Sequence, residues 1–380
     1  MNEKQIQMVD LHGQYLRLKE ELDVAMQSVI DNCAFINGPE VKAFAKHLAD
    51  YLDTPYVVTC GNGTDALQIA LMALGLQPGD EVIVPAFTYV AAAEVVALLG
   101  MVPVLVDVDE RTFNINPELI EEAITDKTKA IVAVHLFGQS CDMARIEALA
   151  AAHGLFVVED NAQSIGAVYT YPDGLQKKTG TMGHIGTTSF FPSKPLACYG
   201  DGGALFTSHP QLAEQVRMIA NHGQQCKYHH QIIGCNSRLD TLQAAILDVK
   251  LKYLDAFNEA RRAVAARYDE AFALVEGLLV PKRSSFSSHV YHQYTLQVAP
   301  EKRELLQRTL KEKGIPSMIY YPLPLHEQEA FKKVARISGS LEVADRLCRS
   351  VLSLPIHTEM DEEEQNKIIE SVKSALATVG

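Results

Sequence analysis

The chain is short of positive charge. It carries 34 lysine and arginine residues against 47 aspartate and glutamate residues, which gives a formal net charge of −13 at pH 7. Because neutralising nucleic-acid phosphates requires a basic face, this balance disfavours a general nucleic-acid-binding protein. It is compatible with a small anionic ligand, since a few donors at one site are enough.

Long hydrophobic runs and a leader segment are also missing. No apolar stretch reaches the roughly 18 to 20 residues of a membrane span. The first residues, 1–7, lack the apolar region of a secretory signal peptide. The sequence therefore predicts a cytoplasmic protein with no membrane segment.

Cysteine is present without a pattern. Seven cysteines are scattered along the chain, and no Cys-x-x-Cys pair occurs. An odd, scattered set is typical of reduced thiols in a reducing compartment. Cys226 and Cys235 lie near His229 and His230, but their spacing fits no usual zinc pattern, so no metal site is expected.

The chain does contain a regular alternation of elements. Between about residues 55 and 210, short runs rich in valine and isoleucine alternate with helix-like stretches. The runs lack strict polar alternation, as expected of strands that are buried on both faces. This order predicts an α/β fold with a mainly parallel central sheet and helices on both sides. The predicted strands are 56–59, 81–85, 102–108, 130–136 and 155–159, and the predicted helices are 64–74, 90–99, 117–124 and 143–153.

The remaining sequence predicts a second, smaller domain. A long helical region at about 238–275 is expected to bridge a large domain, residues 1–250, to a small C-terminal α/β domain, residues 251–380. A predicted helix at 9–32 could pack with the small domain. Other elements predicted in the small domain are a strand at 291–298 and helices at 301–313 and 361–377.

Lys194 has unusual neighbours for a lysine. It lies between a strand-like run, 187–191, and a glycine-dense turn, 200–203, and no charged residue is closer in sequence than Asp201. A lone lysine is most often a solvated surface group. A lysine that is partly removed from water has a lowered pKa and can act as an amine nucleophile. The segment therefore favours Schiff-base chemistry with a carbonyl partner such as pyridoxal phosphate.

Two strand ends carry groups suited to such a cofactor. Gly63 and Thr64 open a helix directly after a strand, where backbone N–H groups, the helix dipole and a hydroxyl can hold a phosphate. An ordinary capped turn is the alternative. Asp160 ends a buried strand, where a carboxylate can keep a pyridine nitrogen protonated. The alternative is that Asp160 caps the next helix.

An aromatic residue and a polar segment complete the candidates. Tyr89 follows a strand and could stack on a flat ring, although core packing is the commoner use of such a residue. Asn236 and Arg238 precede the long helical region and offer an amide and a planar guanidinium suited to a carboxylate or phosphate. Helix capping and a surface arginine are the alternatives there.

Together these segments resemble the DegT/DnrJ/EryC1/StrS family of pyridoxal-phosphate sugar aminotransferases. The runs 190–196, 200–203 and 63–67 carry the resemblance, which extends from Val9 to Pro355. It implies the fold type I, aspartate aminotransferase-like architecture. It also implies cofactor contacts: Lys194 as the Schiff-base lysine and proton shuttle, Asp160 on the pyridine nitrogen, Gln163 near the phenolic oxygen, Tyr89 on the ring, and Gly63, Thr64 and Ser189 on the phosphate.

The resemblance further implies partners and a substrate. Asn236 would reach the cofactor phosphate across the interface of a homodimer, and Arg238 would lie near a substrate carboxylate. Within the family the likeness is greatest to enzymes that aminate C3 of UDP-2-acetamido-2-deoxy-3-oxo-glucuronate, which implies L-glutamate as amino donor and a role in lipopolysaccharide or other surface polysaccharide biosynthesis. The predicted substrate contacts are Arg238, Phe35, Asn37, Tyr320, Tyr321 and His326.

Three alternatives stay open at this point. One is amination at C4 of a 4-oxo UDP- or dTDP-sugar. A second is a related dehydratase, but those relatives carry histidine at the lysine position, so Lys194 argues against it. The third is a non-catalytic regulator or scaffold on the same fold, which would need neither Lys194 nor Asp160.

Overall fold

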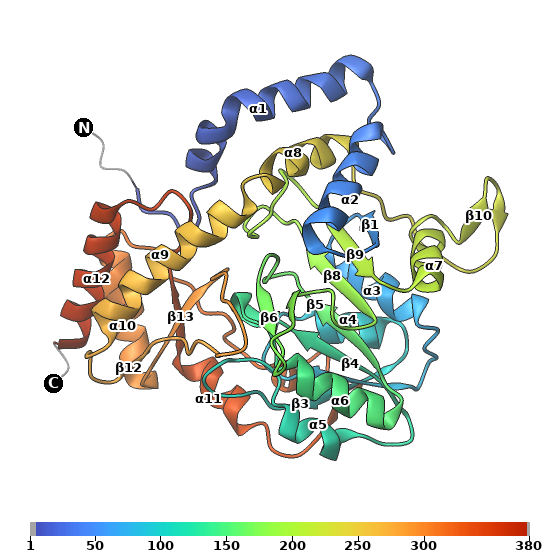
Figure 1. Ribbon diagram of the computed structural model, residues 1–380. Helices are drawn as coiled ribbons and strands as arrows, with labels where there is room; N and C mark the ends of the chain where they lie inside the picture. The colour runs from blue at the N-terminus through green and yellow to red at the C-terminus, as the bar shows by residue number, and fades with distance from the viewer. Residues whose placement is uncertain (1–4, 378–380) are drawn as a thin grey trace.

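The centre of the molecule is an eight-stranded sheet (Figure 1). The computed structural model describes residues 5–377. Residues 1–4 are part of the stretch predicted to lack a signal peptide, and residues 378–380 end the predicted small domain; both lie outside the described residues. Strand β9 runs antiparallel to both neighbours, and the other pairs of the sheet are parallel, which confirms the predicted mainly parallel sheet. The strand order is β1 (Tyr56–Cys60), β9 (Gly203–Thr207), β8 (Ile185–Ser189), β5 (Phe156–Asp160), β4 (Thr128–Val134), β2 (Glu81–Pro85), β3 (Val102–Val106) and β14 (Arg336–Ile337).

Each central strand faces two hydrophobic cores. On β2, Val82 and Val84 belong to one core and Ile83 to the other. Successive side chains of a strand point to opposite faces, so a strand covered on both sides needs apolar residues at every position. The first face is covered by α3 (Gly63–Ala73), α4 (Ala91–Leu98) and α7 (Pro210–Ala220), and the second by α5 (Pro117–Ala123) and α6 (Met143–His153).

A smaller core lies to one side of this sheet. It is built on three antiparallel strands and three helices, and Ile6 from the N-terminal segment packs into it. The strands are β12 (Leu278–Leu279), β13 (Tyr294–Val298) and β15 (Val351–Leu354), and the helices are α9 (Leu254–Phe272), α10 (Pro300–Glu312) and α12 (Glu362–Ala377).

Part of the C-terminal region returns to the large sheet. Helix α11 (Glu342–Ser350) packs against the large core, and the Asp107 carboxylate accepts the N–H groups of Val343 and Ala344, each at 2.9 Å. An acidic group at a helix N-terminus satisfies N–H donors that have no partner within the helix.

The predicted division of the chain into a large domain, residues 1–250, and a small domain, residues 251–380, stays a prediction.

The N-terminal helices cover one end of the molecule. Helix α1 (Leu11–Asn32) packs its Leu18 and Leu22 against α8 (Thr241–Leu251) and Phe257 of α9. The helical region predicted at 238–275 is thus two helices, with a break at Lys252 and Tyr253. Helix α2 (Pro39–Leu52) packs on α8. Short elements complete the fold: the hairpins β6 (Val168–Thr170) with β7 (Gln176–Lys178) and β10 (Gln224–Cys226) with β11 (His229–His230), and the turns η1 (Leu136–Gly138) and η2 (Leu325–Glu327).

The strand directions place the candidate residues at one edge of the sheet. Strands β2, β4, β5 and β8 are parallel, so their carboxyl ends lie at this edge. The carboxyl end of β1 lies there too, because β1 and β8 are both antiparallel to β9. Strands β3 and β4, which follow β2 in the chain, lie on opposite sides of β2 in the sheet, so the order in which the chain adds strands reverses there. Ligands of open α/β sheets bind at such reversals. Across residues 5–377, we find no helix with the length and apolar character that a membrane crossing requires.

Candidate active site

Lys194 lies in a folded turn that follows β8. Phe190 is fully buried and anchors the turn: its N–H donates to Gly202 O at 2.8 Å, and its carbonyl accepts the N–H of Cys198 at 2.9 Å. The Lys194 N–H donates to Phe191 O at 2.8 Å. Within residues 5–377 the Lys194 ammonium has no ion-pair partner, and burial lowers its pKa from 10.5 to about 8, while the charge of Asp160 opposes the shift.

Asp160 and the preceding Glu159 are both buried at the end of β5, but they meet different numbers of donors. The Glu159 oxygens accept from the N–H groups of Gly180, Met182 and Gly183, at 2.6 to 2.8 Å, and from His135 Nε2 at 2.8 Å. Within the described chain the Asp160 carboxylate accepts one hydrogen bond, from the Ala162 N–H at 3.0 Å. Glu159 is therefore a satisfied structural carboxylate, and Asp160 has acceptor capacity left.

The electrostatics of the two carboxylates differ accordingly. The pKa of Glu159 is lowered, because hydrogen bonds and His135 outweigh the cost of burial. The pKa of Asp160 is raised by burial, against the opposing effects of the Ala162 N–H and the Lys194 charge. A cationic N–H donor beside Asp160 would keep this carboxylate ionised. A protonated pyridine nitrogen is such a donor, so the site fits pyridoxal phosphate.

Gln163 is held between two other parts of the site. Its Oε1 accepts the Phe137 N–H at 2.7 Å, and its Nε2 donates to the Tyr321 hydroxyl at 3.3 Å. Tyr321 lies 6.3 Å from the ring of Tyr89, centroid to centroid, and burial together with the nearby Asp160 charge raises its pKa. Tyr89 itself is 56% exposed, so its ring has a free surface at the edge of the sheet. The structure thus brings Tyr89, Asp160, Gln163 and Tyr321 together.

The start of α3 has the form of an anion site. Asn62 caps the helix: its Oδ1 accepts the Asp65 N–H at 2.8 Å, and its carbonyl accepts the Ala66 N–H at 3.1 Å. Among the described residues, the N–H groups of Gly63 and Thr64 are left without a hydrogen-bond partner at the positive end of the helix dipole.

Ser189 closes that site from the side. A Cβ placed on Gly63 would lie 2.6 Å from the Ser189 Cβ, so the two backbones approach closely only because residue 63 is glycine. The start of α3 at Gly63 and the end of β8 at Ser189 are therefore in close contact, a few residues before the turn that carries Lys194.

Four predicted residues, Asn236, Arg238, Phe35 and Asn37, gather around the start of α8. Ser237 ties this segment to the α3 turn of the same chain: its hydroxyl donates to Asp65 Oδ2 at 2.6 Å and accepts the Gly61 N–H at 2.8 Å. Phe35 lies beside it, since its carbonyl accepts the Thr241 N–H at 3.0 Å. The side chains of Asn236, Phe35 and Asn37 are exposed and that of Arg238 is half-buried. Contacts of these residues to a cofactor or substrate stay predictions.

His326 is held by the protein itself. Its Nε2 lies 3.1 Å from Asp345 Oδ1, and the neighbouring Leu325 N–H donates to Ala86 O behind the end of β2. Tyr320 packs next to Tyr321, with ring centroids 6.0 Å apart. A substrate contact for His326 or Tyr320 stays a prediction.

Sequence reasoning missed two histidines near the site. His292 is buried, and its pKa is lowered well below the usual value by burial and by the charges of Lys194 and Arg261, so its imidazole is neutral. Its Nδ1 has no hydrogen-bond partner among the described residues. His135 accepts the Cys141 N–H at Nδ1, which leaves Nε2 to donate to Glu159. Neither role is visible in the sequence, because the partners are far apart along the chain.

Comparisons with known proteins identify the family of this chain. A model of the DegT/DnrJ/EryC1/StrS aminotransferase family matches residues 17–373. Over 356 residues the chain is 48% identical to UDP-2-acetamido-2-deoxy-3-oxo-D-glucuronate aminotransferase of Pseudomonas aeruginosa, which covers 94% of this chain and 96% of that relative. It is 46% identical over 369 residues to a pleiotropic regulatory protein of Geobacillus stearothermophilus, covering 97% of each.

Solved structures agree with the sequence matches. A crystal structure of a DegT DnrJ EryC1 StrS aminotransferase from Brucella abortus superposes with a TM-score of 0.93 at 42% identity, covering 97% of this chain and 99% of the other. The crystal structure of NtdA from Bacillus subtilis, which contains bound cofactor PMP, superposes with a TM-score of 0.86 at 34% identity, covering 94% of this chain and 82% of the other.

Proposed function

The chain belongs to the DegT/DnrJ/EryC1/StrS aminotransferase family, and on that premise we propose that it transfers the amino group of L-glutamate to C3 of UDP-2-acetamido-2-deoxy-3-oxo-glucuronate. It is an aminotransferase whose cofactor is pyridoxal phosphate. One observation carries the assignment to these residues: Lys194, with a lowered pKa, lies near Asp160, a buried carboxylate with spare acceptor capacity.

The residues at the sheet edge would hold the cofactor at both ends. Asp160 would accept a hydrogen bond from the pyridine nitrogen, and the N–H groups of Gly63 and Thr64 with the Ser189 hydroxyl would hold the phosphate. Tyr89 offers an exposed ring for stacking. When bound, pyridoxal phosphate supplies an aldehyde carbon for the lysine and a conjugated ring that takes up electrons as a proton leaves the substrate.

Lys194 would carry the proton during transfer. With a pKa of about 8, about one in ten Lys194 side chains is unprotonated at pH 7, compared with about one in 3,000 for an ordinary lysine. The neutral amine would accept the α-proton of bound glutamate and deliver it to the carbon that the cofactor's aldehyde supplies, so that the nitrogen stays with the cofactor when 2-oxoglutarate leaves. In the second half of a ping-pong cycle, Lys194 performs the same transfer in reverse on the 3-oxo sugar.

A homodimer would complete the site. Exposed apolar side chains, including Phe35, Ile36, Tyr228 and Ile233, flank the segment that carries Asn236 and Arg238. The hairpin of β10 and β11 projects from the body of the molecule beside α7 (Figure 1). A second copy that covers these side chains would bring its own Asn236 and Arg238 to the site, the first to the phosphate and the second to the sugar carboxylate.

The relative with the named substrate supports the choice of sugar. The P. aeruginosa protein, named for UDP-2-acetamido-2-deoxy-3-oxo-D-glucuronate, is matched along 94% of this chain. With the same substrate, this chain would act in the cytoplasm, in the biosynthesis of lipopolysaccharide or another surface polysaccharide. The test is an assay of the purified holoenzyme with L-glutamate and, in parallel, the 3-oxo sugar acid and 4-oxo UDP- and dTDP-sugars, read by mass spectrometry. Amination of the 4-oxo sugars alone would assign the chain to C4 instead.

A regulatory role is the second candidate, because the G. stearothermophilus relative is named for one. It predicts a protein whose biological activity survives loss of Lys194. Expression of Lys194→Ala in a strain that lacks the wild-type protein separates the two functions, since only a regulator would restore the phenotype.

A further inference from the structure

A serine hydroxyl from a distant segment is built into the start of α3. Ser237, which lies 172 residues after Asp65 in the chain, donates its hydroxyl to Asp65 Oδ2 at 2.6 Å. The same oxygen accepts the Gly61 N–H at 2.8 Å. An acidic side chain in the first turn of a helix can itself reach back to backbone N–H groups at the helix start. In this chain the Ser237 hydroxyl stands between the Asp65 carboxylate and the Gly61 N–H instead.

These three residues, Gly61, Asp65 and Ser237, form a compact unit that we call the Ser237 network. Ser237 is 3% exposed, and its N–H donates to Ala220 O, at the end of α7, at 3.0 Å. A Cβ placed on Gly61 would lie 3.0 Å from Asp65 Oδ2 and 3.3 Å from Ser237 Oγ. The hydroxyl and the carboxylate therefore meet over a residue that has no side chain to separate them.

The network determines where a negative charge lies beside the proposed phosphate site. Side chains of a helix tilt toward its N-terminus, so the Asp65 carboxylate lies toward the end of α3 where the N–H groups of Gly63 and Thr64 are free. A carboxylate and a phosphate compete for the same positive end of a helix. Among residues 5–377, Ser237 is the one side chain that hydrogen bonds to this carboxylate.

We propose that Ser237 is a positioning residue for the phosphate site: its hydroxyl holds the Asp65 carboxylate beside Gly61, so that an external phosphate takes the free N–H groups of Gly63 and Thr64. Ser237 acts through Asp65 and not by a contact of its own with the phosphate. The inference rests on the proposed function, since it takes the cofactor phosphate to bind at the start of α3.

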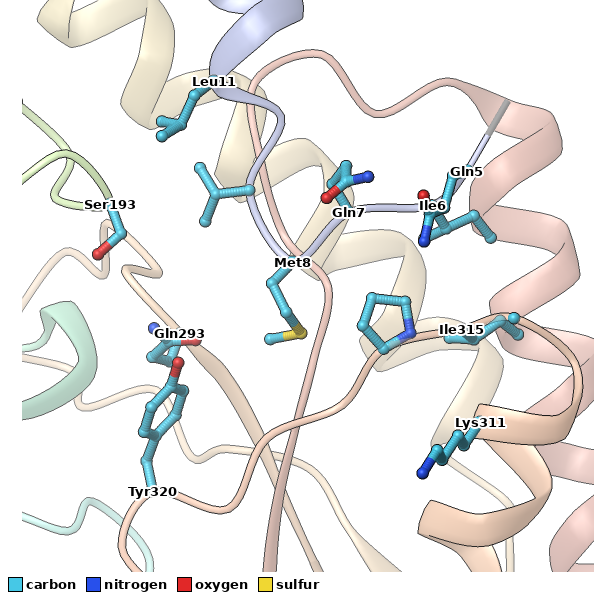
Figure 2. Close-up of a pocket in the computed structure, with 13 residues that line it drawn as sticks. Gln5, Ile6, Gln7, Met8, Leu11, Ser193, Gln293, Lys311, Ile315 and Tyr320 are labelled. Atoms are coloured by element: carbon cyan, nitrogen blue, oxygen red, sulfur yellow. The ribbon is translucent and has the colours of Figure 1, made fainter. Parts of the chain in front are cut away.

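The Ser237 network is separate from the cavity on the other side of the catalytic turn. That cavity has a volume of about 520 Å³ and lies between the segment 5–9 and Ser193, Gln293 and Tyr320 (Figure 2). None of the three network residues lines it. A substitution at Ser237 therefore leaves the cavity walls in place, and its effect is measured on cofactor binding.

The test compares two probes on the full-length, cofactor-free protein. Pyridoxal phosphate and pyridoxal share the ring and the aldehyde, but only the first carries a phosphate. Ser237→Ala is expected to weaken pyridoxal phosphate by about tenfold, measured by equilibrium dialysis, because the freed Asp65 carboxylate then competes for the helix N-terminus. The affinity for pyridoxal is expected to stay as in the wild type.

A second substitution separates the effect of charge from a loss of structure. Asp65→Asn keeps the shape of the side chain and removes its charge, so Ser237→Ala is expected to change the affinity for pyridoxal phosphate by less than about twofold in an Asp65→Asn background. A merely structural role for the hydroxyl predicts the same loss in both backgrounds. Asp65→Asn alone is expected to bind pyridoxal phosphate more tightly than the wild type, which tests the proposal even if Ser237→Ala does not fold.

Thr207 provides a matched control. It is also buried, its hydroxyl donates to His184 O at 2.7 Å, and the same oxygen accepts the His209 N–H at 3.1 Å. It ends β9, which runs antiparallel to β8, so it lies at the opposite edge of the sheet and has no carboxylate partner among residues 5–377. Thr207→Val is expected to leave the affinity for pyridoxal phosphate unchanged.

Four results would overturn the proposal: unchanged affinity for pyridoxal phosphate in a folded Ser237→Ala variant, an equal weakening of pyridoxal, an equal loss in the Asp65→Asn background, or an equal loss in Thr207→Val. Ser189→Ala distinguishes this failure from that of the proposed phosphate site. If Ser189→Ala weakens pyridoxal phosphate and Ser237→Ala does not, the site stands and the role of Ser237 falls. If neither variant weakens it, the proposed site falls as well.

Discussion

Lys194 and Lys250 are both lysines whose pKa is lowered to about 8 by burial, but the charge of Asp160 acts on Lys194 alone of the two. Lys250 lies on α8 with its Nζ 4.3 Å from the centre of the Tyr199 ring. A pKa lowered by burial therefore does not by itself distinguish Lys194 from Lys250. The neighbouring Asp160 carboxylate does distinguish them.

The first prediction concerns where the cofactor is attached. Borohydride treatment of the holoenzyme, followed by digestion and mass spectrometry, is expected to trap the cofactor on Lys194 and not on Lys250. Lys194→Ala is expected to abolish the yellow absorbance and turnover, whereas Lys250→Met keeps both. Cofactor recovered on the Lys250 peptide of the wild-type enzyme would instead make Lys250 the Schiff-base lysine.

A second prediction concerns the charge of Asp160. Asp160→Asn keeps the shape of the side chain but cannot hold a pyridine nitrogen protonated, so kcat is expected to fall by about 100-fold or more. Cofactor affinity, measured by equilibrium dialysis, is expected to change far less. A variant with near-normal kcat would mean that another group sets the protonation of the ring.

The neighbouring carboxylate is expected to respond differently. Glu159→Gln replaces an acceptor of four donors with a group that carries two N–H donors of its own, so the buried network loses hydrogen bonds. The expected cost is about 3 kcal/mol in the free energy of unfolding. Denaturant melts of the cofactor-free protein measure it. Loss of kcat without loss of stability would instead place Glu159 in the chemistry.

The pKa of Lys194 gives a prediction for the cofactor-free protein. Labelling by an amine-reactive reagent, followed residue by residue by mass spectrometry, is expected to reach half its maximum at Lys194 near pH 8. Asp160 raises this pKa, so Asp160→Asn is expected to move the midpoint to lower pH. A midpoint that stays in place or rises in the variant would contradict the coupling of the two groups.

The same shift affects stability with a definite sign. The pKa of Lys194 in the folded state, about 8, is lower than the ordinary 10.5, so the unfolded chain binds more protons between these values. The contribution of Lys194 to stability therefore increases as the pH rises from about 8 to 10.5. Lys194→Met is expected to flatten this part of the stability profile of the cofactor-free protein.

The close approach of Gly63 to Ser189 predicts a steric effect at the proposed phosphate site. Gly63→Ala would bring a Cβ to 2.6 Å from the Ser189 Cβ, so both stability and cofactor affinity are expected to fall. Adding Ser189→Gly removes the clashing atom and is expected to restore the melting temperature. Cofactor affinity is expected to stay low in the double variant because the Ser189 hydroxyl is lost. Full recovery of affinity would remove Ser189 from the site.

The sequence predicted the features that depend on local pattern. The strands 81–85 and 155–159 were recognisable because a strand covered on both faces is apolar at every position, and Asp160 stood out because it ends such a strand. Strand β14, two residues long, could not be predicted, since it exists only through pairing with β3. The antiparallel direction of β9 likewise depends on its two neighbours.

Features that depend on distant contacts were missed. Nothing local marks His292 as a neighbour of Lys194, almost 100 positions earlier, or His135 as the donor to Glu159. The N-terminal segment 5–9 has no sequence signal for a cavity wall, because that role follows from the burial of Ile6 in the small core. Such relationships emerge only when the chain is folded.

We propose that this chain moves the nitrogen of L-glutamate to C3 of a UDP-sugar acid through Lys194. The most direct test gives the holoenzyme isotope-labelled L-glutamate and UDP-2-acetamido-2-deoxy-3-oxo-glucuronate, and locates the label in the product by NMR. The expected result is labelled nitrogen at C3, one 2-oxoglutarate formed for each amine, and no transfer by Lys194→Ala. Unlabelled product, label at another carbon, or transfer by Lys194→Ala would contradict it.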